Sequence, residues 1–281
     1  MAMKDMKVLH AVHPDDFKTY DTEKIRSRFL LTELKEENKA NFAYTHYDRM
    51  IVGLVYPVAE TVVLENYSNL RADYFLERRE IGIINVGGPG SVEADGKIVE
   101  VNKLDALYLG KGVKEVKFKS AAAANPAVFY CLSTPAHQAY PVTLLVHADA
   151  ISTELGSLNT ANERRIIKYI HRDGIQSSQL VMGLTILANG SVWNTMPAHT
   201  HDRRMEAYFY FDVAEDQRVF HLMGQPQETR HVLMGNHDAI VSPPWSIHSG
   251  SGTQNYSFIW GMGGENLDYA DMDPVAIQDI R

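Results

Sequence analysis

The sequence predicts an all-β protein made of two tandem barrels with a few short helices. Along most of its 281 residues, short segments rich in Val, Ile, Tyr and Phe alternate with Gly, Pro, Asn and Asp. That alternation is typical of strands joined by turns. A repeated segment pattern in the two halves indicates related barrels, and one group of histidine and glutamate side chains in the second half indicates that only that barrel binds a metal.

The clearest strands occur in both halves of the chain. They are predicted at residues 49–55, 80–86 and 256–260, where apolar β-formers dominate. Two helices are also expected. The first spans residues 21–34, opened by Asp21-Thr22-Glu23, and the second spans residues 159–169, where Asn159 or Thr160 can act as the cap and the Ile166-Ile167 pair supplies an apolar face.

The repeat consists of a charged segment before a β-run and a second run that begins with aspartate. If Asp105 is aligned with Asp238, Glu115 takes the position of His248, and no His-X-His precedes Glu80. The sequence therefore predicts an N-terminal barrel without metal ligands at residues 1–155 and a C-terminal metal-binding barrel at residues 156–281, with residues 135–158 as the connection. The matched segments are Arg78-Arg79-Glu80 with 105–110, and Arg203-Arg204-Met205-Glu206 with 238–243.

Composition limits the class of protein. The net charge of −8 argues against a nucleic-acid or anionic-membrane binder, and hydrophobic and charged fractions of 45% and 22% are those of a globular protein. Cys131 is the only cysteine, so no intrachain disulfide can form. The start of the chain lacks the apolar stretch of a signal peptide, and no apolar run is long enough for a membrane span. We expect a cytoplasmic protein.

Four residues form the candidate metal site: His199, His201, Glu206 and His248. Alternate residues of a strand share a face, so His199 and His201 can bind one ion from the same side. Glu206 stands an odd number of residues after His201, so a straight strand would point it to the opposite face. A bulge or tight turn at residues 202–204 would return it to the face of the two histidines. Three imidazoles and a carboxylate suit zinc, iron, manganese or nickel. A histidine pair alone is more often part of a solvated edge, and the later glutamate and histidine favour the metal.

Other candidates lie on the same or the following strands. After the reset at 202–204, Arg204 shares the face of Glu206, which makes it a candidate to bind a substrate carboxylate. Its alternative role is an ion pair with a nearby acid. A polar hairpin at residues 220–231 contains Glu228 and His231, and from pattern alone it is more typical of a solvated loop.

The metal pattern resembles the two-part signature of the cupin superfamily. Nearly the whole chain resembles the 5-keto-4-deoxyuronate isomerase family, also called 4-deoxy-L-threo-5-hexosulose-uronate ketol-isomerases. The resemblance implies two cupin (double-stranded β-helix) barrels, a homohexamer, and zinc held by the same four residues of the second barrel. It rests on segments 74–80, 107–112, 199–211, 223–231, 245–250, 258–262, 271–273 and 279–281.

The resemblance also implies a reaction. The family interconverts 5-dehydro-4-deoxy-D-glucuronate and 3-deoxy-D-glycero-2,5-hexodiulosonate, an aldose-ketose isomerisation in pectin and uronate breakdown. Glu206 and Arg204 are expected to contribute to catalysis, and Glu228, His231 or a metal-bound water are the alternatives for the general base. A metal-dependent dioxygenase and a non-catalytic sugar-acid-binding cupin remain alternative functions.

Overall fold

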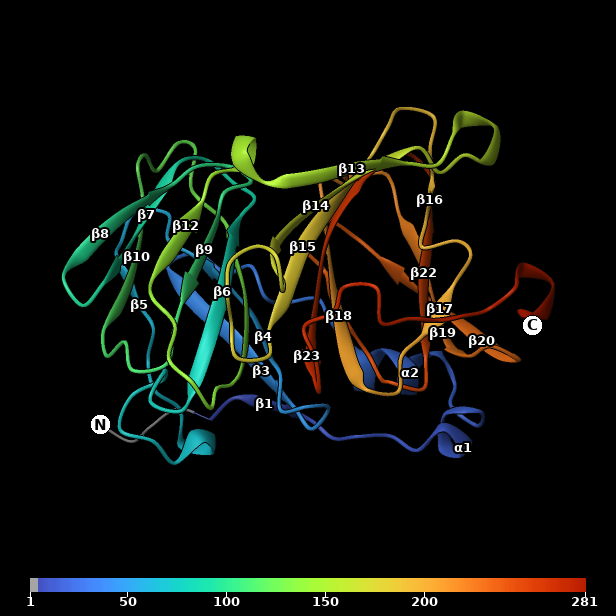
Figure 1. Ribbon diagram of the computed structural model, residues 1–281, viewed down its shortest axis with the longest axis horizontal. Helices are drawn as coiled ribbons and strands as arrows, with labels where there is room; N and C mark the ends of the chain where they lie inside the picture. Colours follow the sequence, from blue (N-terminus) through green and yellow to red (C-terminus); the bar gives the residue numbers. More distant parts are fainter. Residues whose placement is uncertain (1–4) are drawn as a thin grey trace. The chain divides into compact units, whose positions relative to one another are not determined.

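The computed structural model describes residues 5–281 and divides into two compact units (Figure 1). The first unit comprises the segment ending at Leu9 together with Glu33–Ala150 and Tyr169–Val181; the second comprises His10–Thr32, Ile151–Lys168 and Met182–Arg281. This division differs from the boundary expected between residues 155 and 156, because one early segment belongs to the second unit and one central segment to the first. Residues 1–4, part of the N-terminus expected to lack a signal peptide, lie outside the described range.

The first unit contains a seven-stranded and a four-stranded sheet. In the larger sheet the order is β1-β3-β4-β11-β6-β9-β12, and in the smaller it is β5-β10-β7-β8. Buried side chains of both sheets form one apolar core that includes Ile83, Val92 and Phe129. The strands are β1 Lys7–Leu9, β3 Lys39–Thr45, β4 Ile51–Tyr56, β5 Val62–Val63, β6 Arg79–Asn85, β7 Gly90–Ala94, β8 Lys97–Val101, β9 Ala106–Leu109, β10 Val116–Ser120, β11 Phe129–Pro135 and β12 Thr143–Leu145.

The second unit repeats this arrangement. Its seven-stranded sheet has the order β13-β14-β15-β23-β18-β21-β2, its four-stranded sheet has the order β16-β22-β19-β20, and β17 pairs with β24 alone. The strands are β2 Leu30–Leu31, β13 Ile151–Leu155, β14 Arg164–Ile170, β15 Val181–Leu187, β16 Trp193–Asn194, β17 His199–Thr200, β18 Arg204–Phe211, β19 Val219–Gln225, β20 Glu228–Met234, β21 Ala239–Ser242, β22 Ile247–Gly252, β23 Ser257–Gly264 and β24 Asp273–Pro274.

The matching strand orders confirm the all-β fold of two related barrels. Strands β4-β11-β6-β9 of one sheet correspond to β15-β23-β18-β21 of the other, and the hairpin β7-β8 corresponds to β19-β20. The predicted strands at 49–55, 80–86 and 256–260 coincide with β4, β6 and β23 to within a few residues.

The register explains why the two barrels differ in their interiors. Leu109 stands four residues after Asp105 and pairs with Ile81, whereas Ser242 stands four residues after Asp238 and pairs with Glu206. The residue of the first unit that corresponds to Glu206 is therefore Ile81, an apolar side chain, and not the adjacent Glu80.

Glu80 is fully buried and has a different task. Its carboxylate accepts hydrogen bonds from the hydroxyls of Tyr108 at 2.7 Å and Thr134 at 3.0 Å. It also accepts from three consecutive backbone N–H groups, at residues 178, 179 and 180, over 2.6–2.9 Å. A buried carboxylate is stable only with such partners, so Glu80 fixes the 178–180 segment within the first unit.

Helices are few among the described residues. Helix α1 Pro14–Phe17 has His13 as its cap, and α2 Thr22–Phe29 begins after Asp21, whose carboxylate accepts from the Lys24 N–H at 2.8 Å. The helix expected at 21–34 is confirmed in its first part. Short 3-10 turns lie at η1 Ser68–Leu70, η2 His147–Asp149, η3 Leu158–Thr160 and η4 Ile277–Asp279. Neither α-helix is long or apolar enough to cross a membrane.

The helix expected at 159–169 is wrong. The chain there forms η3, turns at Ala161 with a φ of 50°, and continues as strand β14. Ala161 in the left-handed region ends the helical turn, and the β-branched pair Ile166-Ile167 then pairs with β13. This correction changes the expected directions of the side chains at residues 164–169.

Candidate metal centre and its pocket

Four side chains of the second unit converge on one point. One ligand atom from each of His199, His201, Glu206 and His248 lies within 4.8 Å of the other three, and this is the one such group found among the described residues. Glu206 Oε2 lies 3.0 Å from His201 Nε2 and 2.8 Å from His248 Nε2, and the Nε2 atoms of His199 and His248 are 2.9 Å apart. The group is at most partly exposed, since His201, Glu206 and His248 are buried.

A tight turn brings these residues together. The Arg204 N–H donates to the His201 carbonyl at 3.3 Å, so residues 201–204 close a four-residue turn between β17 and β18. After the turn, Glu206 and Tyr208 face the barrel interior from alternate positions of β18. His248 reaches the same point from β22, which pairs with β19 in the opposite sheet.

Hydrogen bonds orient the imidazole of His201. Its Nδ1 lies 3.0 Å from the carbonyl oxygen of Arg204, which can only accept a hydrogen bond, so Nδ1 carries the hydrogen and donates it. Nε2 is left with a lone pair directed toward Glu206 and His248. This is the arrangement by which a carbonyl fixes the tautomer of a metal-binding histidine.

The electrostatics favour a neutral His199 and an ionised Glu206. Burial, together with charge repulsion from His248, lowers the pKa of His199 to about 3. Burial alone would raise the pKa of Glu206, but the charge of His248 and hydrogen bonds from His201 and His248 outweigh it and lower that pKa. Burial lowers the pKa of His201, yet the hydrogen bond and charge of Glu206 raise it overall.

These residues fit a divalent metal. Metal–ligand bonds of about 2.0–2.2 Å for zinc place neighbouring ligand atoms about 3–4 Å apart, compatible with four atoms inside 4.8 Å. Two imidazole lone pairs at 2.9 Å repel each other unless a cation or a proton lies between them. The buried His-His-Glu-His group can therefore bind a metal, and its donor set suits zinc, iron, manganese or nickel.

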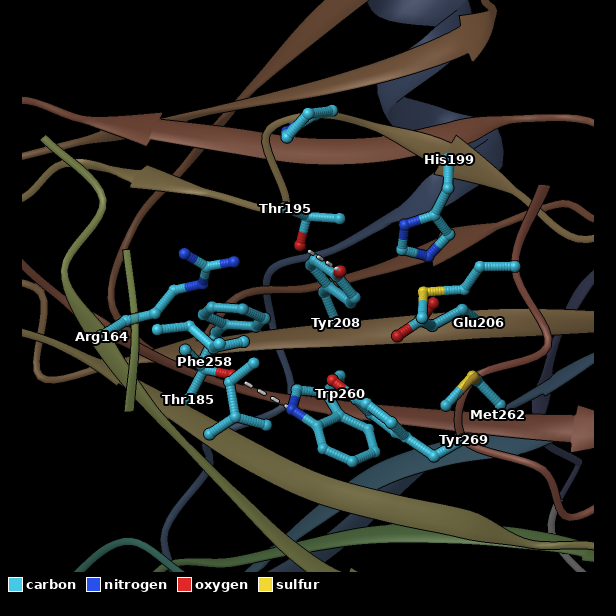
Figure 2. A pocket seen from close by; sticks show the side chains of 14 residues that line it. Arg164, Thr185, Thr195, His199, Glu206, Tyr208, Phe258, Trp260, Met262 and Tyr269 are labelled. Atoms are coloured by element: carbon cyan, nitrogen blue, oxygen red, sulfur yellow. Dashed lines mark hydrogen bonds between the residues drawn. The ribbon is translucent and has the colours of Figure 1, made fainter. Parts of the chain in front are cut away.

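A pocket of about 220 Å³ opens beside the group (Figure 2). His199 and Glu206 form part of its wall, and its remaining surface is largely aromatic and apolar. Its polar lining groups include Thr195 and Tyr208, whose hydroxyls are 3.0 Å apart, Thr185, whose hydroxyl accepts from Trp260 Nε1 at 3.2 Å, and Arg164. Figure 2 shows Arg164 on the opposite side of the pocket from His199 and Glu206, with Tyr208 between them. The principal aromatic and apolar residues are Ile166, Phe258, Trp260, Met262, Tyr269 and Met272.

The side chain of Arg204, predicted to bind a substrate carboxylate, lies in a different environment. It is 1% exposed, and its guanidinium donates to the carbonyls of Asp268 at 2.7 Å and Asp271 at 3.1 Å. It also donates to the Asn266 side chain and the Tyr269 carbonyl, each at 3.3 Å. Arg204 thus holds the 266–271 segment, which contributes Tyr269 to the pocket, and its own side chain does not line that pocket.

Glu228 and His231 also lie outside the pocket lining. Both are on β20, where Glu228 pairs with Arg230 at 2.7 Å and the exposed His231 packs against Phe220. This geometry agrees with the solvated hairpin that the sequence pattern favoured. A role for Glu228 or His231 as the general base stays a prediction, and their contacts do not support it.

Sequence reasoning did not identify Arg164, Tyr208 or Tyr269 as pocket residues. Tyr208 was within reach, because it shares strand parity with Glu206 on β18. Arg164 was assigned to a helix, and Tyr269 lies in an irregular segment whose position depends on Arg204.

Comparison with known proteins shows which family the chain resembles over nearly its whole length. The model of the KduI/IolB family matches residues 30–277. A protein named 4-deoxy-L-threo-5-hexosulose-uronate ketol-isomerase from Caldicellulosiruptor bescii is 54% identical over 276 residues, covering 98% of this chain and 100% of its own. One of the same name from Formosa agariphila is 53% identical over 272 residues, covering 97% of each chain.

Solved structures share the fold at low sequence identity. An IolB-like protein from Salmonella typhimurium superposes with a TM-score of 0.68 at 16% identity, over 88% of this chain and 96% of that one. The Bacillus subtilis oxalate decarboxylase, studied for its Mn(II) centres, gives a TM-score of 0.55 at 9% identity, over 80% and 71%. These likenesses support the all-β architecture alone.

Proposed function

The chain belongs to the KduI/IolB family, and from this premise we propose that it is a ketol-isomerase acting on 4-deoxy-L-threo-5-hexosulose uronate. The observation that carries the proposal is full-length identity above 50% to relatives with that name. The His-His-Glu-His group beside a small pocket supplies a site suited to such chemistry.

The reaction moves one hydrogen from C2 to C1 and one proton from the C2 hydroxyl to the C1 oxygen. In the open-chain substrate, C1 is an aldehyde and C2 carries a hydroxyl; in the product, the first is a hydroxymethyl carbon and the second a ketone. No oxidant or reductant is needed, because one carbon is reduced as the other is oxidised. A metal held by His199, His201, Glu206 and His248, which we propose to be zinc, would supply Lewis-acid stabilisation of negative charge on the substrate oxygens.

The residues around the group supply the remaining functions. Glu206 directs Oε2 to two imidazoles, and its second oxygen, Oε1, is the pocket's candidate to take the C2 proton and return it to C1. Burial raises the pKa of Tyr208 well above its ordinary value, so its hydroxyl stays protonated and can donate to a substrate oxygen. The aromatic wall restricts water around the reacting carbons.

A comparison of histidine variants tests the proposal. We expect His248→Ala to lose bound metal and turnover together, whereas His137→Ala, an exposed histidine of the first unit, retains both. Elemental analysis of the purified proteins measures the metal, and zinc at about one atom per chain is the expected result for wild type. Full turnover by a metal-free variant would contradict a catalytic metal.

The route of the hydrogen is tested by NMR in deuterated water. Transfer through Glu206 predicts deuterium at the product's hydroxymethyl carbon, because a carboxylic acid exchanges its proton with solvent. Complete retention of the substrate hydrogen would instead indicate a hydride shift and remove the base role of Glu206. Oxygen consumption with the uronate would favour the dioxygenase alternative, since isomerisation uses no oxygen.

The finer family expectations belong to the same proposal. We propose a homohexamer located in the cytoplasm. Sedimentation equilibrium of the purified protein tests the first, and cell fractionation tests the second.

A further inference from the structure

Arg164 is the cationic side chain that lines the pocket. It comes from β14 and stands across the pocket from His199 and Glu206 (Figure 2). Between these two ends, the lining is mostly aromatic and apolar. The pocket therefore has two polar ends of different chemistry: a metal-type group at one and a guanidinium at the other.

The guanidinium of Arg164 has spare hydrogen-bonding capacity. Its Nη1 donates to the Asn162 carbonyl at 2.8 Å, and no carboxylate among residues 5–281 forms an ion pair with it. Burial lowers the pKa of Arg164, which reflects the loss of water around a charge that has no counter-ion. A guanidinium presents five N–H donors, so most remain available to an anion in the pocket.

The neighbouring arginines are already engaged. Arg203 binds the carboxylates of Asp271 at 2.6 Å and Asp273 at 2.9 Å. Arg204 donates to the carbonyls of the 266–271 segment and does not line the pocket. Arg164 alone among these three combines a position in the pocket with unused donors.

The separation of the two ends suits a short chain. In the seven-stranded sheet, β14 and β18 are three strand positions apart, which amounts to about 14 Å between backbones before the curvature of the sheet shortens it. The side chains of Arg164 and Glu206 extend inward from those two strands. A six-carbon chain of roughly 1.5 Å bonds extends about 6 Å, which is of the right order to bridge the remaining gap.

We propose that Arg164 binds the carboxylate of the substrate and so places the aldehyde end beside His199 and Glu206. This inference rests on the proposed function and adds a specificity determinant to it. A sugar of the same length without the carboxylate would lack this anchor and would occupy the pocket in several positions.

Kinetics of Arg164 variants test the anchor. The substrates are the uronate and its C6 amide, which is neutral but otherwise the same length. We expect Arg164→Gln to lower kcat/KM for the uronate by roughly 10- to 100-fold, the usual effect of losing hydrogen bonds to a charged group, and to change that for the amide by less than about threefold. Arg164→Lys keeps the charge without the planar fork and should fall between wild type and Arg164→Gln.

Arg165→Gln is the matched control, because Arg165 is the next residue of β14, is exposed and does not line the pocket. It should leave kcat/KM for both substrates unchanged. Thermal unfolding of each variant excludes a general loss of structure, and Arg164→Lys provides the test if Arg164→Gln is unstable. Equal losses for uronate and amide would overturn the anchor.

A binding measurement separates this inference from the proposed function. The probe is the uronate whose aldehyde has been reduced to an alcohol, which retains the carboxylate and cannot isomerise. Calorimetry should show binding to wild type and Arg165→Gln and roughly 10- to 100-fold weaker binding to Arg164→Gln. If wild type binds the probe but does not isomerise the uronate, the function fails and the anchor stands. If Arg164→Gln binds the probe as wild type does, the anchor fails even when the isomerase activity is present.

Discussion

Replacing Arg204 with methionine separates its packing role from a role in binding substrate. Methionine fills much of the buried volume but cannot donate to the carbonyls of Asp268 and Asp271, the two shorter of the four hydrogen bonds. Hydrogen bonds from a charged donor contribute about 1.5–3 kcal/mol each. The loss is partly offset, because Arg204 Nε is buried without a partner in the wild type and because the released, half-buried segment can bind water. We expect the free energy of unfolding to fall by about 2–3 kcal/mol.

Activity should fall for a structural reason. Tyr269 lies in the segment that Arg204 holds, and Tyr269 and Met272 both line the pocket, so kcat/KM should drop roughly 10- to 100-fold for the uronate and its amide alike. Metal content should stay at the wild-type level, because the contact to His201 Nδ1 comes from the backbone carbonyl of residue 204. Chemical denaturation, elemental analysis and steady-state kinetics measure the three quantities.

Arg203→Gln is the control for Arg204→Met. Arg203 forms partly exposed ion pairs, which typically contribute about 0–1 kcal/mol, so its replacement should have a much smaller effect on stability. The reasoning is refuted if Arg204→Met keeps wild-type stability. A loss confined to the carboxylate substrate would instead support the role predicted for Arg204 from the sequence.

Two further predictions concern charged groups outside the metal ligands. The hydrogen bond from Arg203 lowers the pKa of Asp271 from 3.8 to about 2. This carboxylate therefore stabilises the fold above pH 4 and loses that contribution as the pH falls toward 2. The difference in unfolding free energy between wild type and Asp271→Asn should shrink over this range, and a difference independent of pH would contradict the assignment. Glu80→Gln replaces one carboxylate oxygen, which accepts hydrogen bonds, with an amide NH₂ group that faces N–H and O–H donors. The unfolding free energy of the first unit should therefore fall by about 3 kcal/mol or more, while metal content is unchanged. Hydrogen exchange at residues 178–180 should accelerate in that variant, and unchanged protection there would count against the role of Glu80.

Strand parity was enough to predict how most of the His-His-Glu-His group comes together. The alternation of His199 with His201 and the need for a reset before Glu206 follow from the two-residue period of a strand. The structure supplies that reset as the 201–204 turn. His248 was proposed as the fourth ligand because it follows a Pro-Pro turn later in the chain, and the family resemblance implied the same residue.

Long-range pairing decided what the sequence left open. The Ile166-Ile167 pair fits the apolar face of a helix and equally a buried strand, and only pairing with β13 and a place beside β15 select the strand. Because residues 159–169 were expected to form a helix, the sequence did not place Arg164 in a pocket. The environment of Arg204 is likewise set by carbonyls more than sixty residues later in the chain, which no local pattern reveals.

The short strand that carries His199 links the candidate metal-binding group to the C-terminal segment of the chain. Strand β17 has two residues, and its one partner is β24, with His199 opposite Pro274 and Thr200 opposite Asp273. A ribbon this short is barely stable without support from its surroundings. A metal bound by His199 and docking of the C-terminal segment would therefore strengthen each other by the same free energy. Truncation before residue 273 would then weaken metal affinity, and chelation of the metal would expose the C-terminal segment to proteases.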